Sequence, residues 1–371
     1  MDFAFTAEQE ELRRTVRSFL ERRSSAADVL RLMADERGYD VEVWRLMAGQ
    51  LGLHGLAVPE EYGGGGFGMV ELGAVLEEMG RAVLCGPFFS TVVLATTALL
   101  ASGDREACKD LLPGIVAGDT VATLALVEES GRWDEDGIRL TAERGPGGWR
   151  LTGRKDFVPD GNLADVILVA ARTGGGVSLF AVDGRAQGLA REALPTLDKT
   201  RRQALLGFQQ VPARLVGERA AAWPVLRHTL DVAAVALAAE QAGGAAAVLD
   251  MAVGHAKTRV QFGRPIGSFQ AIKHKCADMA VAVESARATA QYALWTAATG
   301  AEDLPVVASL AKAHCSEAFT RCAETNVQIH GGIGFTWEHP AHLYLKRAKS
   351  SEMFLGSPRH HRDALAQRAG F

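Results

Sequence analysis

The chain has 371 residues, which is too long for one ordinary hydrophobic core, so two or three packed units are expected. It is 48% hydrophobic and 23% charged with a formal net charge of -4, which gives no electrostatic reason to expect nucleic acid or an anionic membrane surface as a partner. Its 5 cysteines are scattered without a CxxC spacing, which indicates reduced thiols, a cytoplasmic location and no structural zinc.

The first third of the chain has helical periodicity. Thr6 is expected to cap the first helix, because acidic residues fill the next turn and apolar residues then recur on one face. This acidic start lacks the basic-then-apolar pattern of a signal peptide. Further helices are expected over roughly 41–51, 69–82, 88–102 and 107–117. We find no apolar run that predicts a membrane-spanning helix, so no membrane partner is expected.

Four consecutive glycines follow Tyr62, within the stretch 53–67. A phosphate-binding loop of the P-loop type needs a GK[ST] continuation within a βαβ unit, and the sequence has neither. A turn between helices is the better interpretation.

From about residue 119 the pattern changes to short β-prone runs separated by Gly, Asp and Pro, and from residue 223 helical patterns return. The short runs predict a small antiparallel sandwich or barrel. The expected fold class is therefore α+β and multi-domain, with an N-terminal helical domain (1–118), a middle antiparallel β domain (119–222) and a C-terminal helical bundle (223–371). Nothing alternates as in a Rossmann fold, which argues against dinucleotide binding of that type.

An arginine- and glycine-rich turn separates two long helical patterns in the last segment. The stretch 259–279 reads RVQFGRPIGSFQAIKHKCADM. Arg259 and Phe262 place a cation with five donors beside an aromatic ring, which suits a phosphate and a planar ring system. The alternative is that Arg259 compensates helix C-terminal carbonyls while Phe262 fills the core.

A second glycine turn, QIHGGIGFTWEHP, covers 328–340. Adjacent glycines let backbone amides approach a ligand, and Gln328 can bond a pyrophosphate or an adenosine hydroxyl. Alternatively, the Gly-Gly pair only breaks a helix. The histidines here and at 360–361 lack zinc-ligand spacing, so we expect no metal.

These motifs resemble those of the acyl-CoA dehydrogenase family across nearly the whole chain. Besides the two turns, they include PEEYGG (59–64), WRLTGRKDF (149–157) and VPARLVGE (211–218). The resemblance implies a C-terminal four-helix bundle and FAD-dependent α,β-dehydrogenation of an acyl-CoA or carrier-bound acyl thioester. It also implies electron transfer to an electron-transfer flavoprotein or another acceptor. In the tetramer that it implies, the ADP end of one subunit's FAD is held by the next subunit.

The resemblance assigns two groups of residues to FAD. The ADP-side group is intact: Arg259, Phe262, Gln328, Gly331 and Gly332. The flavin-ring group falls on two strands: Leu126, Val127, Phe157 and Val158. This second group departs from the family pattern. Val127 and Trp133 replace hydroxyl residues, and Pro159 replaces a threonine, so a side-chain hydroxyl and a backbone N–H are lost together.

The family's catalytic base is also missing. The glutamate of the commonest branch aligns with Leu355, which cannot take a proton, and the position used by another branch is Ala233. The nearest carboxylate is Asp231, our candidate base, although it points about 200° away from Ala233 on an ideal helix and a solvated or capping role is commoner for such a residue. Glu240 and Glu352 are further options.

Three functions remain open. The chain is a subunit of an acyl-thioester dehydrogenase, either self-sufficient as a homotetramer with a relocated base or the partner of a catalytic subunit in a heterotetramer. Alternatively, it is a flavin oxidase or monooxygenase of the same fold, whose reduced flavin would react rapidly with oxygen. The third possibility is a scaffold that binds neither FAD nor acyl-CoA.

Overall fold

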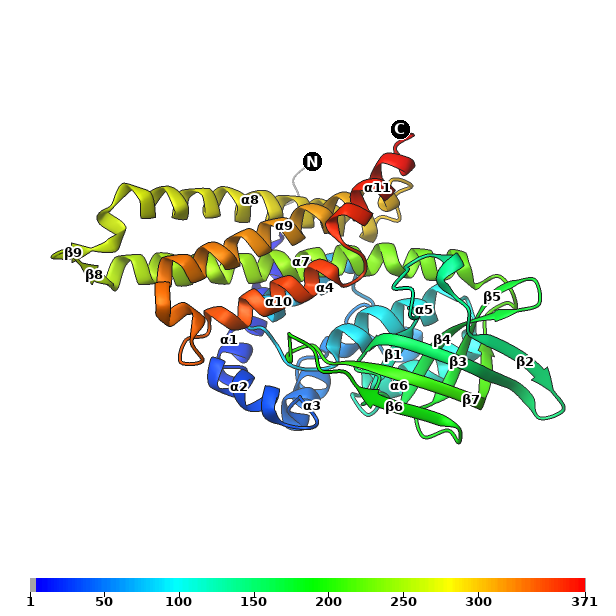
Figure 1. Cartoon of the computed structure of the whole chain (residues 1–371). Helices are drawn as coiled ribbons and strands as arrows, with labels where there is room; N and C mark the ends of the chain where they lie inside the picture. Colours follow the sequence, from blue (N-terminus) through cyan, green and yellow to red (C-terminus); the bar gives the residue numbers. More distant parts are fainter. Residues whose placement is uncertain (1–4, 371) are drawn as a thin grey trace. The chain divides into compact units, whose positions relative to one another are not determined.

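The computed structural model describes residues 5–370, whose contacts divide the chain into two units (Figure 1). Unit 1 comprises Met1–Arg31, Met69–Leu84 and Ala234–Phe371, and unit 2 comprises Leu32–Gly68 and Cys85–Ala233. Each unit is therefore built from segments far apart in the sequence. The three consecutive domains with boundaries at residues 118 and 222 stay a prediction.

Unit 1 is helical, as expected for both ends of the chain. Its helices are α1 (Ala7–Arg23), α4 (Met69–Arg81), most of α7 (Ala222–Thr258), α8 (Gln270–Ala298), α9 (Leu304–His330), α10 (Ala341–Met353) and α11 (Pro358–Arg368). Helix α9 packs against α8, α10 and α11, and Figure 1 shows α8 and α9 side by side. The predicted cap of α1 is confirmed, because Thr6 Oγ1 accepts from the Gln9 N–H and the Gln9 side chain accepts from the Thr6 N–H.

Glycines let α4 and α7 cross closely inside unit 1. A Cβ atom on Gly80 of α4 would lie 1.9 Å from the Glu240 carbonyl oxygen, and one on Gly243 of α7 would lie 1.8 Å from the Glu77 carbonyl oxygen. Any larger residue at either position would push the two backbones apart. The sequence places a glycine on each helix at this crossing, which fixes Glu240 beside the end of α4.

Helix α7 contradicts the expectation that no run is long and apolar enough to span a bilayer. It has 37 residues, and its most apolar 18-residue window has a mean hydropathy of 1.6. However, 89% of that window is buried inside the protein. This helix is apolar mainly because it contains many small alanines and few polar residues. A pattern that requires long aliphatic side chains therefore does not indicate its hydropathy. A single such helix is weak evidence for a membrane span, because the core helix of a soluble protein has the same properties. The cytoplasmic location and the absence of a membrane partner stay predictions.

Unit 2 begins with short helical elements. They are α3 (Val41–Gly49), the 3-10 turns η1 (Leu53–Gly55) and η2 (Glu60–Tyr62), the π-helix η3 (Phe89–Ala95), α5 (Thr96–Ala101) and α6 (Arg105–Val116). Helix α2 (Ala26–Ala34), which was not predicted, leads from unit 1 into unit 2 along the chain. The glycine-rich stretch after Tyr62 forms turns, as expected. The predicted helix over 88–102 is π-helical in its first half, where Thr91 Oγ1 bonds the backbone of Ala122.

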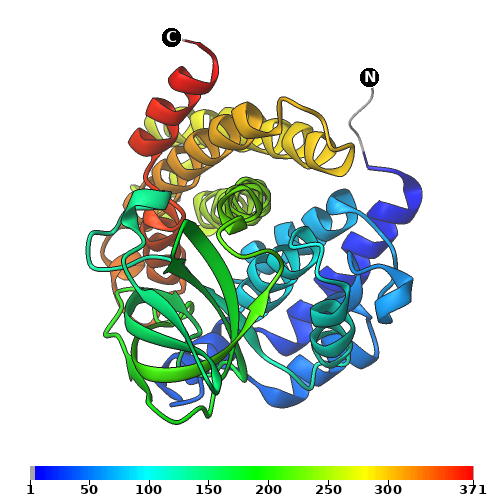
Figure 2. The same cartoon turned by 90° about the vertical axis from the view of Figure 1, so that its right-hand side faces the viewer.

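The β domain forms the rest of unit 2. Its strands are β1 (Ala122–Ala125), β2 (Thr141–Gly145), β3 (Gly148–Pro159), β4 (Val166–Thr173), β5 (Gly176–Asp183), β6 (Leu189–Ala193) and β7 (Gln203–Val216). The pairings β4–β2–β3–β7–β5–β4 close a ring, and Figure 2 shows these strands curving around one another. Most pairings are antiparallel, as predicted. However, β1 runs parallel to β4, because the β2–β3 hairpin lies between them in the chain and lets β4 return in the direction of β1.

Candidate functional site

The turn between α7 and α8 presents its predicted contacts to solvent. It forms a hairpin from β8 (Val260–Gln261) and β9 (Arg264–Pro265), with Phe262 at the tip in a left-handed conformation (φ 54°). The Phe262 side chain is 91% exposed, so the interpretation that it fills the core is wrong. The Arg259 guanidinium makes no hydrogen bond or ion pair with any residue between 5 and 370, so it does not cap the carbonyls of α7.

The second turn follows α9 and is equally open. Gln328 is exposed, and Gly331 begins the 3-10 turn η6 (Gly331–Phe335) with a φ of 66°. A Cβ atom added to Gly331 or Gly332 would meet no atom within 4 Å. The backbone of both glycines is therefore accessible to a ligand.

A pair of stacked histidines joins the two turns within unit 1. His255, one turn before Arg259, stacks on His330 with the ring centroids 4.1 Å apart, and the His339 ring lies tilted against His330 at 4.2 Å. Burial, His330 and Arg259 lower the pKa of His255. The stacking of His255 on His330 holds the ends of α7 and α9 together. Sequence reasoning missed His255, because no local pattern reveals a contact between residues 75 positions apart.

The ADP-side group therefore fits its expected ligand. An uncompensated guanidinium suits a phosphate, an exposed aromatic ring suits a planar base, and two exposed glycines allow a ligand to approach the backbone closely. The N–H of Gly331 itself donates to the Val327 carbonyl. All five members belong to unit 1: Arg259, Phe262, Gln328, Gly331 and Gly332.

The flavin-ring group lies in unit 2, where Lys155 organises the strands. Its Nζ is fully buried and donates to the Leu126 carbonyl (2.9 Å) and to Glu128 Oε1 (2.7 Å). Burial lowers the pKa of Lys155 to about 8. The Val127 carbonyl accepts from the Asp156 N–H (2.9 Å). Because these carbonyls are engaged, a ligand would meet Leu126 and Val127 chiefly through their N–H groups.

The adjacent part of β3 is irregular at the predicted contacts. The register with β7 shifts between Lys155 and Val158, and Phe157 within that shift is half-exposed with a φ of 53°. Such strained backbone often marks a ligand site. Val158 is buried, so only its backbone can reach a ligand. Pro159 has no N–H to offer, and its carbonyl accepts from Thr123 Oγ1 (2.6 Å). This side fits a flavin ring less completely than the first group fits ADP.

The segment that links α10 to α11 has a fixed backbone and an apolar side chain. Leu355 is 3% exposed with a φ of 62°. Its carbonyl accepts a hydrogen bond from His361 Nε2 (2.9 Å). Burial, together with the nearby Lys312, lowers the pKa of His361 to about 3 and keeps the ring neutral. Lys312 Nζ is buried and donates to the carbonyls of Glu352 (3.2 Å) and Gly356 (3.1 Å). The backbone carbonyls of this segment are therefore held by the side chains of His361 and Lys312, which lie outside the segment.

Comparison with known proteins identifies the family. The acyl-CoA dehydrogenase N-terminal domain profile matches residues 6–119, and the C-terminal domain profile matches residues 222–370. The chain belongs to the acyl-CoA dehydrogenase family. It is 36% identical over 352 residues to the acyl-CoA dehydrogenase IpdE2 of Mycolicibacterium smegmatis, with 95% of this chain and 96% of that protein covered.

Two solved structures extend this similarity. A variant of the Tcur3481–Tcur3483 steroid ACAD has a TM-score of 0.87 and 34% identity, covering 98% of this chain and 99% of that one. The ChsE4–ChsE5 complex of Mycobacterium tuberculosis has a TM-score of 0.91 and 31% identity, covering 100% and 99%. As an acyl-CoA dehydrogenase, the chain is a flavin-dependent oxidoreductase whose family dehydrogenates acyl thioesters.

The candidate bases of this acyl-CoA dehydrogenase differ in their surroundings. Glu240 is buried and forms an ion pair with Arg347 (2.8 Å). Glu352 is partly exposed and lies 3.6 Å from the Lys349 ammonium. Asp231 lies within α7 and is only 7% exposed, so the interpretation that it is solvated is wrong. Its assignment as the base stays a prediction.

The expectation of no metal also stays a prediction. Within residues 5–370, no three His, Cys, Asp or Glu side chains gather in a way that could hold a metal ion.

Proposed function

We propose that this acyl-CoA dehydrogenase is the non-catalytic partner in a mixed tetramer, where it holds the ADP end of FAD bound mainly by a related subunit. The observation that carries the proposal is Leu355. A buried hydrocarbon occupies the position where the commonest branch of the family has its base. The ADP-side contacts, by contrast, are present and uncovered.

The bound FAD would supply an oxidised ring that accepts a hydride from the β-carbon of the acyl group. In this chain, Arg259 would hold a phosphate, the exposed Phe262 ring would contact the adenine, and the exposed backbone at Gly331 and Gly332 would allow the ADP end to approach closely. The α-proton leaves to a carboxylate of the catalytic subunit, because Leu355 cannot accept it.

Two similarities support a heteromer and indicate a substrate to try. Both solved relatives described above carry the names of two components, and one is called a complex. One is also called a steroid ACAD. We therefore propose a steroid-derived acyl-CoA as the first substrate class to test against fatty acyl-CoA. Transfer of the electrons to an electron-transfer flavoprotein stays a prediction.

Co-expression tests the proposal directly. The chain is purified alone and together with a family member encoded beside it, and the flavin absorbance of each preparation is recorded before and after adding acyl-CoA. We expect flavin at full occupancy, and bleaching by acyl-CoA, only in the co-purified complex. Full occupancy and bleaching in the single chain would refute the partner role.

The rival function is a self-sufficient dehydrogenase that uses Asp231. It is favoured by one observation, the burial of this carboxylate within α7. The variant Asp231→Asn separates the two proposals. A self-sufficient enzyme would lose bleaching in this variant but keep its flavin, whereas the mixed complex would retain both. An oxidase would be recognised by rapid reoxidation of the bleached flavin in air.

A further inference from the structure

Three histidines of unit 1, here called the histidine cluster, connect the two turns that carry the ADP-side group. The ring centroids of His255 and His330 lie 4.1 Å apart, and those of His330 and His339 lie 4.2 Å apart. His255 precedes Arg259 by one helical turn, and Gly331 directly follows His330. The ring contacts therefore set how far apart the arginine and the glycines lie.

Hydrogen bonds restrict the protonation of two of these rings. His330 Nδ1 lies 2.9 Å from the Asn326 carbonyl, to which it donates, because a carbonyl can only accept. His339 Nδ1 accepts from the N–H of Ala341, the first residue of α10, at 3.2 Å. A protonated imidazole has a donor on each nitrogen and no acceptor. His339 can therefore hold the start of α10 only while it is uncharged.

The groups whose charge acts on the cluster are cations. Burial, followed by His330 and Arg259, lowers the pKa of His255 below its usual 6.5. Burial also comes first for His339, whose pKa is lowered further by the other two histidines of the cluster and by His342. Both His255 and His339 are therefore uncharged at neutral pH, and a proton on either would be met by positive charge.

The elements packed around the cluster add to this positive charge. The 3-10 turn η5 (Ile266–Ser268) has no titratable side chain, and it packs so closely on α7 that a Cβ atom on Gly267 would lie 2.8 Å from the Ala256 carbonyl oxygen. Further cations lie on the two helices that pack against α9: Lys273, His274 and Lys275 at the start of α8, and Lys346 on α10.

The carboxylates nearest along the chain cannot fully compensate these cations. Asp250 on α7 pairs with Arg81, and Glu324 on α9 pairs with Lys349. Glu338, in the turn before α10, is exposed, so solvent screens its charge. A proton taken up by the cluster therefore meets mostly positive charge.

We propose that the histidine cluster positions the two ADP-side turns, holding them together while His255 and His339 are uncharged and separating them when these rings are protonated. The new charges repel one another and Arg259, and the Ala341 N–H loses its acceptor. Because both pKa values are lowered in the folded chain, the stability that the cluster contributes is complete above pH 6.5 and is lost as the pH falls below that value.

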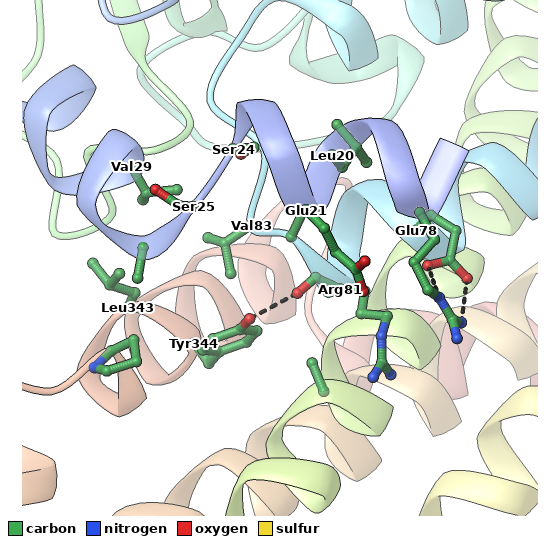
Figure 3. Close-up of a pocket in the computed structure, with 15 residues that line it drawn as sticks. Leu20, Glu21, Ser24, Ser25, Val29, Glu78, Arg81, Val83, Leu343 and Tyr344 are labelled. Carbon is green, nitrogen blue, oxygen red and sulfur yellow. Dashed lines mark hydrogen bonds and ion pairs between the residues drawn. The ribbon is translucent and has the colours of Figure 1, made fainter. Parts of the chain in front are cut away.

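Helix α10 should stay in place when the turn before it moves. The Tyr344 hydroxyl donates to the Arg81 carbonyl at the end of α4 at 2.7 Å, a bond that Figure 3 shows. Leu343, next to it in α10, is buried. The movement is therefore expected within residues 331–341 and 255–266 only.

Hydrogen exchange of the chain as purified tests the positioning without acyl-CoA and without added FAD. Exchange is measured at about pH 7.5 and about pH 5.5, on either side of the histidine range, and corrected for the intrinsic pH dependence of the chemistry. We expect residues 331–341 and 255–266 to exchange about tenfold faster at the lower pH after this correction. The amides of α4, and those of α10 beyond Tyr344, should not change and serve as the internal reference.

A double variant, His255→Phe with His339→Asn, assigns the response to the cluster. Phenylalanine keeps an aromatic ring against His330, asparagine keeps an oxygen that can accept from the Ala341 N–H, and neither can be charged. We expect this variant to lose the acid response. His228→Asn is the matched control and should keep it, because His228 is an exposed histidine of the same helix as His255.

No acid response in the parent, or an equal response in the double variant, would overturn the proposal. If the double variant fails to fold, the ring protons of His255 and His339 are titrated by NMR in the parent. Their midpoints should match that of the exchange response, and a mismatch would also overturn the proposal.

Release of FAD in acid is a consequence that rests on the proposed function, so it is measured separately in the co-purified complex. We expect flavin retention to fall at the lower pH in the parent but not in the double variant. Faster exchange with unchanged retention would support the positioning role and refute the ADP-side assignment. Tighter retention in acid would show that the histidines pair with the pyrophosphate, and it would overturn the proposal.

Discussion

The buried ion pair between Glu240 and Arg347 leads to a prediction about stability that can be tested without assuming the proposed function. Arg347 Nη1 lies 2.8 Å from Glu240 Oε1, and Arg347 Nη2 donates to the Leu84 carbonyl at 3.0 Å. Both charged side chains are almost fully buried. We expect this pair to be structural, because it joins α10 to α7.

The expected magnitudes follow from what each variant leaves behind. Arg347→Met strands a buried carboxylate and Glu240→Gln strands a buried guanidinium, so each should lower the free energy of unfolding by about 3–5 kcal/mol. The double variant leaves no charge and leaves the Leu84 carbonyl without its donor, a cost of about 1–3 kcal/mol. The coupling free energy between the two sites should therefore be at least about 3 kcal/mol.

Urea unfolding of the parent, the two single variants and the double variant measures this cycle at neutral pH. The exposed pair of Arg14 and Glu11 on α1 serves as the control, with an expected coupling below about 1 kcal/mol. A coupling between Glu240 and Arg347 as small as the control would refute the reasoning. Loss of acyl-CoA bleaching in Glu240→Gln with unchanged stability would instead identify Glu240 as a base.

Three further predictions concern the cofactor, the Leu355 segment and pH. Arg259→Ala should weaken FAD retention by about tenfold or more, since a charge-assisted phosphate contact is worth about 1.5–3 kcal/mol. The FAD that remains bound is measured by flavin absorbance after dilution. Arg264→Ala, on the same hairpin, is the control and should retain the cofactor. Leu355→Ala should lower the free energy of unfolding by about 2–5 kcal/mol without changing the rate per flavin of the complex, because the side chain only packs; a fall in that rate would contradict the partner role. The pKa of His361 falls from 6.5 in the unfolded chain to about 3 in the folded chain, so its contribution to stability is complete above 6.5 and is lost as the pH falls toward 3. Urea midpoints should therefore decrease with acid in that window, and His361→Asn should flatten the dependence.

Local signals in the sequence predicted much of the fold. Thr6 forms the expected cap, and the helices over 69–82 and 107–117 appear within two residues of their expected limits. Capping, periodicity and turn residues act between neighbours in the chain, so one sequence is enough to recognise them. The exposed hairpin around Phe262 belongs to the same class, because a glycine turn between two helices is itself a local feature.

Features that depend on distant contacts could not be predicted in this way. The π-helix Phe89–Ala95 carries Thr91, whose hydroxyl bonds Ala122 in β1, and the stack of His255 on His330 joins two helix ends. The parallel pairing of β1 with β4 also depends on strands separated by a hairpin. Each contact is selected by tertiary packing, which overrides local propensity.

The two departures from the family pattern differ in how the structure accommodates them. The backbone around Leu355 is held by His361 and Lys312, which bond carbonyl groups and do not depend on the side chain at position 355. A base can therefore be lost there without disturbing the segment. Pro159 changes the backbone itself, because proline has no N–H to donate. Independent catalysis would need two compensating changes, a base at another position and a flavin-ring contact that does not use the N–H missing at Pro159. Retaining the ADP-side contacts while relying on a catalytic subunit requires neither change, which is why the partner role accounts for both departures together.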